Sequence, residues 1–349
     1  MSTTYRSVAW NPQKRRYDLV AASLIVGFLV VALTVQSALR PELTIETLLI
    51  RAFGAAAFTL LSVILCIGPL ARLNRRFLPL LYNRRHLGVM MFTLGLSHGL
   101  FSIIQFHSAG AINPLVSVLV SNDRYGTIAQ LPFQPFGLAA LVILFAMAAT
   151  SHDFWLHNLT APVWKALHMC VYVAYTFIVL HVVFGVLQGE VSRLLGWTLC
   201  GAVLTVLTLH LVAARHEAPG DRENRDVRRD GFVDVCGVDE IPEKRAVVTC
   251  LSGERVAVFR YDGRISAISN VCQHQNGPLG EGRIVNDCVV CPWHGYEYHP
   301  ATGASPAPFT EKVPTFDVRV MAGRVLVHPQ PHAPGTQLEP VVLIEARTA

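Results

Sequence analysis

Long apolar runs dominate the first 214 residues of the chain, and the remaining residues have the mixed composition of a soluble domain. A membrane-spanning helix needs about 20 mostly apolar residues, and six windows without charged residues meet or approach that length. They are Leu19–Leu39, Ala52–Ala71, Leu87–His107, Ile128–Thr150, Ala166–Gly189 and Leu194–Ala214. The pattern predicts an α-helical membrane bundle of six transmembrane helices.

The soluble part contains short β-rich runs instead. These runs are Val247–Cys250, Arg255–Arg260 and Ile265–Ser269, and Gly253 and Asp262-Gly263 lie between them as hairpin turns would. We therefore expect an all-β domain after the bundle. The predicted organisation is an N-terminal segment (1–18), a transmembrane domain (19–214), a charged linker (215–230), a β-domain (231–329) and a Pro-rich tail (330–349).

The charge distribution predicts how the chain lies in the membrane. The formal net charge is +5, but the Lys and Arg residues flank apolar runs, which favours membrane orientation over nucleic-acid binding. With the N-terminus inside, the inside segments carry 15 Lys and Arg residues and the outside segments carry 4. The asymmetry predicts a multi-pass protein of the inner (cytoplasmic) membrane with the N-terminus and the β-domain in the cytoplasm.

The cysteines indicate metal binding more than disulfide bonding. Of eight cysteines, Cys66, Cys170 and Cys200 lie within apolar runs, and the other five lie in the soluble part. An odd number with metal-ligand spacing argues against a disulfide framework, and a cytoplasmic location favours reduced thiols.

The strongest motif in the chain is Cys272-x-His274 followed by Cys291-x-x-His294. A Rieske [2Fe–2S] centre needs two thiolates on one iron and two imidazoles on the other, and each half of the motif supplies one of each. The alternative is a structural zinc site, in which Cys288 and Cys291 would form a knuckle. The cluster hypothesis instead makes Cys288 a strand residue.

The surrounding residues resemble those of the Rieske family over about residues 231–329. Gly277-Pro278-Leu279, Gly295-Tyr296 and Gly303 resemble the cluster loops and the turn that follows them. The resemblance implies a ferredoxin-type domain for two reasons. Gly277 and Trp293 stand where high-potential members have the cysteines of an extra disulfide, and Tyr296 stands where those members have a hydroxyl that donates a hydrogen bond to the cluster. We expect a reduction potential low in the range of about −150 to +300 mV.

Histidines within the apolar runs are candidate haem ligands, because ionisable residues at membrane depth are costly and usually functional. At 1.5 Å per residue, His98 and His181 both lie roughly 18–20 Å from the cytoplasmic helix ends, and His86 and His168 share a shallower level. The alternative for each of these histidines is that it only forms a hydrogen bond to a neighbouring helix. For His86 this alternative is the favoured interpretation. The 13-residue spacing of His168 and His181 turns an ideal helix by about 140°, so either the fifth helix is irregular, perhaps near Gly185, or only one of these two histidines binds this haem.

Two segments resemble the ferric reductase-like transmembrane family over about residues 17–213, and are similar to the haem-bearing membrane subunit of the bacterial methionine-sulfoxide reductase system. They are Arg84-Arg85-His86-Leu87-Gly88 with His98, and Trp164-Lys165-Ala166-Leu167-His168 with Tyr172 and His181. The resemblance implies haem b, one or two per chain, held by His98, His168 and His181. His86, where the family usually lacks a histidine, is a further candidate for a second haem, and Met169 departs from the family's basic residue.

Both predicted cofactors carry one electron, and the soluble part has no Gly-rich dinucleotide fingerprint. We therefore expect transmembrane electron transfer from a cytoplasmic donor through the Rieske cluster and haem to an outer-face acceptor, which is a partner protein, a quinone or ferric iron. The chain is then an oxidoreductase or an electron-transfer subunit in contact with membrane lipid. The alternatives are a non-catalytic redox-sensing or docking subunit of a larger complex, and a ferric or quinone reductase.

Overall fold

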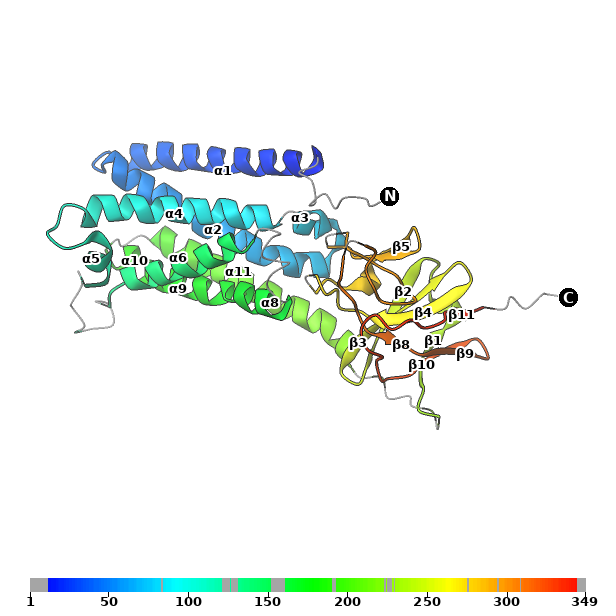
Figure 1. The fold of residues 1–349 in the computed structure, drawn as a ribbon. Coiled ribbons are helices and arrows are strands. Elements are labelled where there is room, and N and C mark those ends of the chain that lie inside the picture. The colour runs from blue at the N-terminus through cyan, green and yellow to red at the C-terminus, as the bar shows by residue number, and fades with distance from the viewer. Residues whose placement is uncertain are drawn as a thin grey trace. The chain divides into compact units, whose positions relative to one another are not determined.

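The computed structural model describes residues 12–343, except residues 83, 121–125, 127–130, 152–160, 190–192, 223, 225–227, 229, 275, 294 and 308. The chain forms two compact units, and the boundary between them follows Leu211. The first unit is helical and the second is built mainly from β-strands (Figure 1).

Five helices of the described residues are long and apolar enough to cross a membrane. They span Lys14–Leu39 within α1 (Pro12–Leu39), α2 (Ile45–Leu73), α4 (Arg84–His107), Ala166–Gln188 and α11 (Arg193–Glu217). A sixth apolar helix, α6 (Gln134–Ala149), has 16 residues. It begins later than the predicted window because Pro135 favours the first turn of a helix. The helices match the predicted bundle, with the fourth shorter than expected. Shorter elements connect them: η1 (Arg75–Phe77), α3 (Leu78–Tyr82) and α5 (Pro114–Val120).

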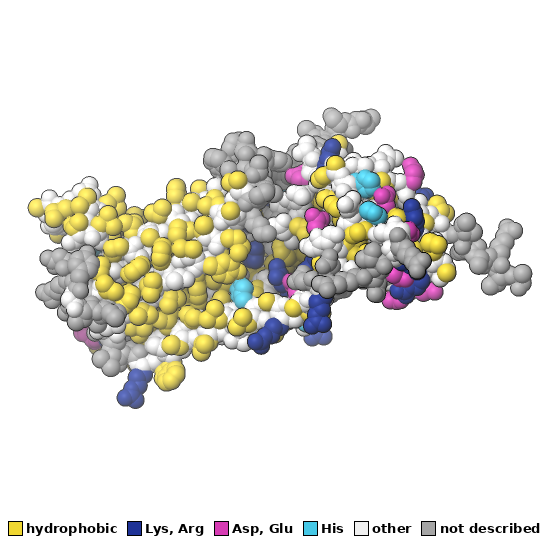
Figure 2. Space-filling model, turned by 90° about the horizontal axis from the view of Figure 1, so that it is seen from below, with side chains coloured by type: hydrophobic (Ala, Val, Ile, Leu, Met, Phe, Trp, Pro, Cys, Tyr) yellow, Lys and Arg dark blue, Asp and Glu magenta, His cyan; other side chains and the backbone are white. Residues whose placement is uncertain are grey.

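The outward surface of the helical unit is apolar. Leu24, Leu194 and Trp197 are each exposed by 70% or more, and hydrophobic side chains cover most of the helical face seen in Figure 2. A soluble protein rarely exposes a contiguous apolar patch of such extent, whereas lipid chains solvate it. Together with the five long helices, this surface identifies an integral, multi-pass membrane protein.

The fifth apolar segment is divided into three helices, α8 (Ala161–Met169), α9 (Val171–Phe184) and α10 (Val186–Gly189). At Cys170 the backbone N–H bonds to the carbonyl of Leu167, three residues earlier, which tightens the turn. A second interruption lies at Gly185. His168 and His181 therefore lie on different helices, and the fifth segment is irregular, which was one of the two alternatives left open by their spacing.

The core of the bundle lies among α2, α4, α6, α9 and α11. Leu61, Met91, Leu144 and Ala174 are buried there. The Tyr175 hydroxyl forms a hydrogen bond of 3.1 Å with Ser62 Oγ. Buried polar groups need such partners, because an unpaired one costs roughly 1–3 kcal/mol.

The second unit contains three antiparallel sheets. The first is β1 (Val233–Gly237), β10 (Arg324–Val327) and β9 (Val318–Met321). The short helix η3 (Ala218–Asp221) precedes β1 along the chain. The second is β11 (Val341–Val342), β4 (Arg264–Ser269), β3 (Glu254–Tyr261) and β2 (Arg245–Leu251), with β8 (Thr315–Phe316) also paired to β4. The third is β5 (Arg283–Val285), β6 (Cys288–Val290) and β7 (Glu297–Tyr298). The domain also contains η4 (Val238–Glu240) and η5 (Leu279–Glu281). The predicted all-β domain is confirmed.

Strand β3 separates two hydrophobic cores. Successive side chains of a strand point to opposite faces, so Val256 and Val258 lie in one core while Ala257 and Phe259 lie in the other. The second core also contains Cys272 and Cys291. This core is therefore the support on which the two predicted cluster loops rest.

Tight turns connect the strands as the sequence predicted. Ser252-Gly253 and Asp262-Gly263 all have positive φ, the signature of a type I′ hairpin turn. The register is continuous from Arg245↔Arg260 to Leu251↔Glu254 and from Val256↔Ser269 to Tyr261↔Arg264.

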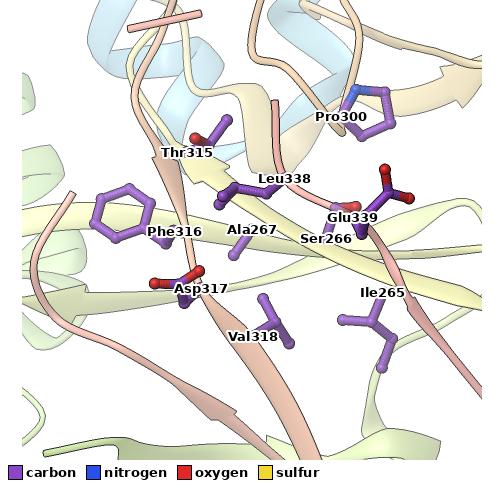
Figure 3. A pocket seen from close by; sticks show the side chains of 10 residues that line it. All are labelled: Ile265, Ser266, Ala267, Pro300, Thr315, Phe316, Asp317, Val318, Leu338 and Glu339. Atoms are coloured by element: carbon purple, nitrogen blue, oxygen red, sulfur yellow. The ribbon is translucent and has the colours of Figure 1, made fainter. Parts of the chain in front are cut away.

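The segment after residue 330 packs against the β-domain, although its prolines indicated a tail. Val341 and Val342 pair with β4, and Thr315 Oγ1 donates to the carbonyl of Thr336 at 3.0 Å. Figure 3 shows a hollow beside this segment, with Leu338 and Glu339 facing β4 and β8. Its lining, among the described residues, includes none of the predicted cluster ligands.

Candidate functional site

The two predicted cluster loops have the same backbone design. In the first loop the Cys272 N–H donates to the carbonyl of Gly277, and the Asn276 N–H donates to the carbonyl of Cys272. In the second loop the Cys291 N–H donates to Tyr296, and the Gly295 N–H donates to Cys291. Asn276 and Gly295, at the equivalent position of each loop, both have positive φ. Each loop is thus a closed turn that begins at its cysteine.

The two loops lie against each other at Gly277. A Cβ atom at this position would lie 2.6 Å from Cys291 Sγ and 3.2 Å from the ring of Trp293, so only glycine fits. Cys272 and Cys291 are fully buried, with exposed fractions of 0% and 1%. The structure therefore brings both thiol-bearing loops together.

The histidines of the motif are described in part. The His274 ring stacks on Tyr296, with ring centroids 4.7 Å apart, and Tyr296 in turn contacts Phe309 edge-on at 4.6 Å. The rings of Tyr296 and Phe309 thus hold the imidazole of the first loop in position. His294 lies outside the described residues.

Tyr298 is a site residue that the sequence analysis missed. Its hydroxyl lies 3.4 Å from Cys272 Sγ and accepts the N–H of Gln273 at 3.1 Å, which leaves its proton for the sulfur. Tyr298 is completely buried. Burial, and then the neighbouring Cys272, raise the pKa of this phenol, so that it remains a protonated donor. The signal in the sequence was a tyrosine two residues beyond Tyr296, on the strand that follows the second loop.

Cys288 lies on strand β6, as the cluster hypothesis predicted, with its sulfur 3.5 Å from His299 Nδ1. Burial, reinforced by Glu297 and Asp287, raises the pKa of this thiol to about 11. Metal ligation requires a thiolate, so this environment disfavours Cys288 as a ligand. All eight cysteines lie among the described residues, and none forms a disulfide.

In the helical unit, His98 on α4 and His181 on α9 face each other. Their ring centroids are 6.0 Å apart, and their planes cross at 88°. The Nδ1 of His98 donates to the Ile50 carbonyl, and the Nδ1 of His181 donates to the Phe133 carbonyl, both at 2.9 Å. Carbonyl oxygens only accept, so the proton lies on Nδ1 and each Nε2 keeps its lone pair.

His168 has the same tautomer but a different environment. Its Nδ1 donates to the Trp164 carbonyl at 3.0 Å, and its ring stacks on the Trp164 indole at 3.8 Å. Its Nε2 is buried without a hydrogen-bond partner. A neutral imidazole ligates metals through such a nitrogen.

Two other membrane histidines are already engaged. The Nδ1 of His86 lies 2.8 Å from the buried carboxylate of Asp18, and the His86 side chain is 42% exposed. His210 donates from Nδ1 to the Val206 carbonyl, and its Nε2 accepts the hydroxyl of Tyr172 at 2.9 Å. Both ring nitrogens of His210 are therefore satisfied.

Two family models match the chain, one in each unit. Residues 53–179 match "Ferric reductase like transmembrane component", and residues 231–317 match "Rieske [2Fe-2S] domain". The first range contains α4 with His98 and α8 with His168, and it ends two residues before His181. The second contains both loops of the cysteine–histidine motif.

Characterised relatives align with the β-domain. The ferredoxin component of the alkene monooxygenase system of Xanthobacter autotrophicus is 30% identical over 101 residues, which are 29% of this chain and 83% of that protein. Cholesterol 7-desaturase nvd 1 of Ciona intestinalis is 44% identical over 71 residues, 20% of this chain, and the chain spans only 15% of that protein's length. The solved ferredoxin of carbazole 1,9a-dioxygenase from Nocardioides aromaticivorans aligns at 28% identity with a TM-score of 0.27, over 28% of this chain and 98% of that one.

The two family models together cover parts of both units. The β-domain belongs to the Rieske family, and its paired loops carry the motif of that family. The chain as a whole is a membrane redox protein in which a ferric reductase-like transmembrane component is fused to a C-terminal Rieske [2Fe–2S] domain.

Proposed function

We propose that the chain transfers single electrons across the membrane, between a cytoplasmic donor and an acceptor at the outer face. A bound Rieske cluster and a bound haem b each supply one-electron chemistry. The observation that carries the proposal is the His98–His181 pair, because the two rings lie opposite each other with centroids 6.0 Å apart, and ionisable residues at membrane depth are usually functional.

The donor set of the β-domain suits a two-iron cluster. We propose Cys272 and Cys291 as the thiolate ligands and His274 and His294 as the imidazole ligands. A Rieske centre takes two thiolates on one iron and two imidazoles on the other, and the motif supplies two of each.

The His98–His181 pair suits one iron porphyrin. His98 and His181 would hold the iron between them, because their ring centroids are 6.0 Å apart and metal–imidazole bonds are about 2 Å long. The Nδ1–H bonds to Ile50 and Phe133 orient the rings, as the hydrogen bonds of metal-ligating histidines usually do. His168 offers a third imidazole, whose buried Nε2 has no hydrogen-bond partner. Counting the haem per chain in a His168→Ala variant distinguishes one bound haem from two.

We propose a cytoplasmic donor on the basis of charge. The Lys and Arg asymmetry favours a cytoplasmic location of the Rieske domain, where a soluble donor would reach it. Several relatives of this domain are ferredoxin components of oxygenase systems, so we propose a reductase or reduced ferredoxin as the donor. The acceptor at the outer face is a partner protein, a quinone or ferric iron.

We predict that Tyr298→Phe lowers the reduction potential of the cluster by about 60 mV. The hydroxyl lies 3.4 Å from Cys272 Sγ and accepts the Gln273 N–H, so its own proton would be donated to a ligating thiolate, and a hydrogen bond to a sulfur stabilises the more negative, reduced cluster. Loss of roughly 1.5 kcal/mol, at the low end for a hydrogen bond to a charged group, corresponds to about 60 mV for one electron. Protein-film voltammetry of both proteins measures the difference, and an unchanged potential would show that Tyr298 is only a packing residue.

The proposal is tested by analysing the cofactors of the purified full-length protein. We expect b-type haem absorbance on reduction, a Rieske EPR signal, and iron with acid-labile sulfide in a preparation free of stoichiometric zinc. Zinc in place of iron and sulfide would refute the cluster assignment. A folded, colourless helical unit would refute the haem assignment.

A further inference from the structure

His98 and His181 are each held by the same arrangement of a backbone carbonyl and a glycine, which we call a socket. Each donates its Nδ1–H to a carbonyl that lies 48 residues earlier in the chain, Ile50 for His98 and Phe133 for His181. Four residues after each carbonyl comes a glycine, Gly54 on α2 and Gly137 on α6. The same three-part arrangement of carbonyl, glycine and histidine thus occurs twice, once between α2 and α4 and once between α6 and α9.

Both glycines are in contact with the imidazole itself. A Cβ atom on Gly54 would lie 2.9 Å from His98 Nδ1 and 3.1 Å from its Cε1, and a Cβ atom on Gly137 would lie 2.7 and 2.9 Å from the same atoms of His181. Real Cβ atoms do not approach other atoms so closely, so alanine at either position moves the ring. Each imidazole is therefore held between the carbonyl oxygen that accepts its Nδ1–H and the backbone of a glycine on the neighbouring helix.

The sockets fix the rotation of each ring as well as its position. A hydrogen bond at Nδ1 together with contact along one edge leaves the ring little freedom to turn about its Cβ–Cγ bond. The two sockets belong to different helix pairs, and the rings they hold cross at 88°. The perpendicular orientation is thus built into the protein.

Perpendicular axial imidazoles have a spectroscopic consequence. Each imidazole interacts through its π system with one of two iron d orbitals. Parallel rings act on the same orbital and split the pair, whereas perpendicular rings act on both and keep them close in energy. A nearly degenerate pair gives ferric low-spin haem a strongly anisotropic EPR signal, with one very large g value in place of an ordinary rhombic spectrum.

We infer that Gly54 and Gly137 are positioning residues that hold the two axial imidazoles of the haem in perpendicular planes. The inference rests on the proposed haem site and deepens it. It assigns a role to two residues that neither bind iron nor appear in the ligand motif, and it predicts a property of the bound haem that the ligand identities alone do not determine.

The test is EPR spectroscopy of the oxidised full-length protein with its haem. For the wild type we expect the strongly anisotropic signal. For Gly54→Ala and Gly137→Ala we expect a shift toward a rhombic signal, or a loss of bound haem of about 10–100-fold, the usual effect of disturbing the groups around a metal ligand. Gly88→Ala is the matched control, because Gly88 lies on α4 with His98 and has nothing within 4 Å of its added Cβ.

Each outcome is decisive. A rhombic wild-type spectrum overturns the inference, and so do Gly54→Ala and Gly137→Ala proteins with full haem and an unchanged signal. If these variants fail to accumulate in membranes, the wild-type spectrum decides alone. A wild type that binds no haem refutes the proposed function instead, so the two failures are distinguishable.

Discussion

Replacing His181 by alanine removes the haem held between His98 and His181 from the purified protein. The ring of His181 lies opposite that of His98, with ring centroids 6.0 Å apart. Disturbing only the groups around a metal ligand costs about 10–100-fold in affinity, so losing the ligand itself has a larger effect. The pyridine haemochrome assay, normalised to protein, measures the loss, and His98→Ala gives the same result.

Matched variants separate ligation from general damage to the bundle. His210→Ala removes a membrane histidine whose ring nitrogens are both satisfied within the protein, and His86→Ala removes one that is paired with Asp18. Both variants are expected to retain the His98–His181 haem. Full haem content in His181→Ala, or equal losses in all four variants, would contradict the assignment.

Replacing Cys272 by serine abolishes the Rieske cluster, whereas replacing Cys288 by alanine does not. Cys272 is a buried loop residue with a hydrogen-bond donor aimed at its sulfur, while Cys288 is a strand residue whose thiol pKa is raised to about 11 by burial and nearby carboxylates. We expect the EPR signal and the acid-labile sulfide to disappear in the first variant. The second should keep both, with a loss of stability of about 1 kcal/mol, typical of a core truncation of this size.

The same pair of variants tests the zinc alternative. A zinc knuckle built on Cys288 and Cys291 predicts that Cys288→Ala loses the metal along with the fold of the domain. Iron and sulfide that persist in Cys288→Ala exclude the knuckle. Cluster loss in Cys288→Ala with retention in Cys272→Ser would reverse our ligand assignment.

The Rieske loops were predictable from the sequence because their information is local. Cys272 and His274 lie on one turn and Cys291 begins the next, and both turns close within six residues. The hairpins at Gly253 and Asp262-Gly263 were predictable for the same reason, because a positive φ at both central residues has a strong sequence preference. Short-range chemistry is therefore sufficient to predict these elements.

Other parts of the site depend on contacts between distant segments. The depth of His98 and His181 follows from helix rise, but the approach of Gly54 and Gly137 depends on which helices pack together. The interruption at Cys170 contains neither proline nor glycine, so no local signal marked it. Tyr298 reaches Cys272 across 26 residues, and β11 forms in a segment whose prolines predicted a tail.

Electron exchange between the iron–sulfur centre and a haem held by membrane imidazoles of the same polypeptide is tested most directly by reducing the Rieske cluster of the purified full-length protein in a stopped-flow instrument and following the b-type haem absorbance. We predict that the haem becomes reduced as the cluster reoxidises, and that His181→Ala protein, with its cluster intact, shows no such phase. A cluster that stays reduced beside an oxidised, normally bound haem would contradict it.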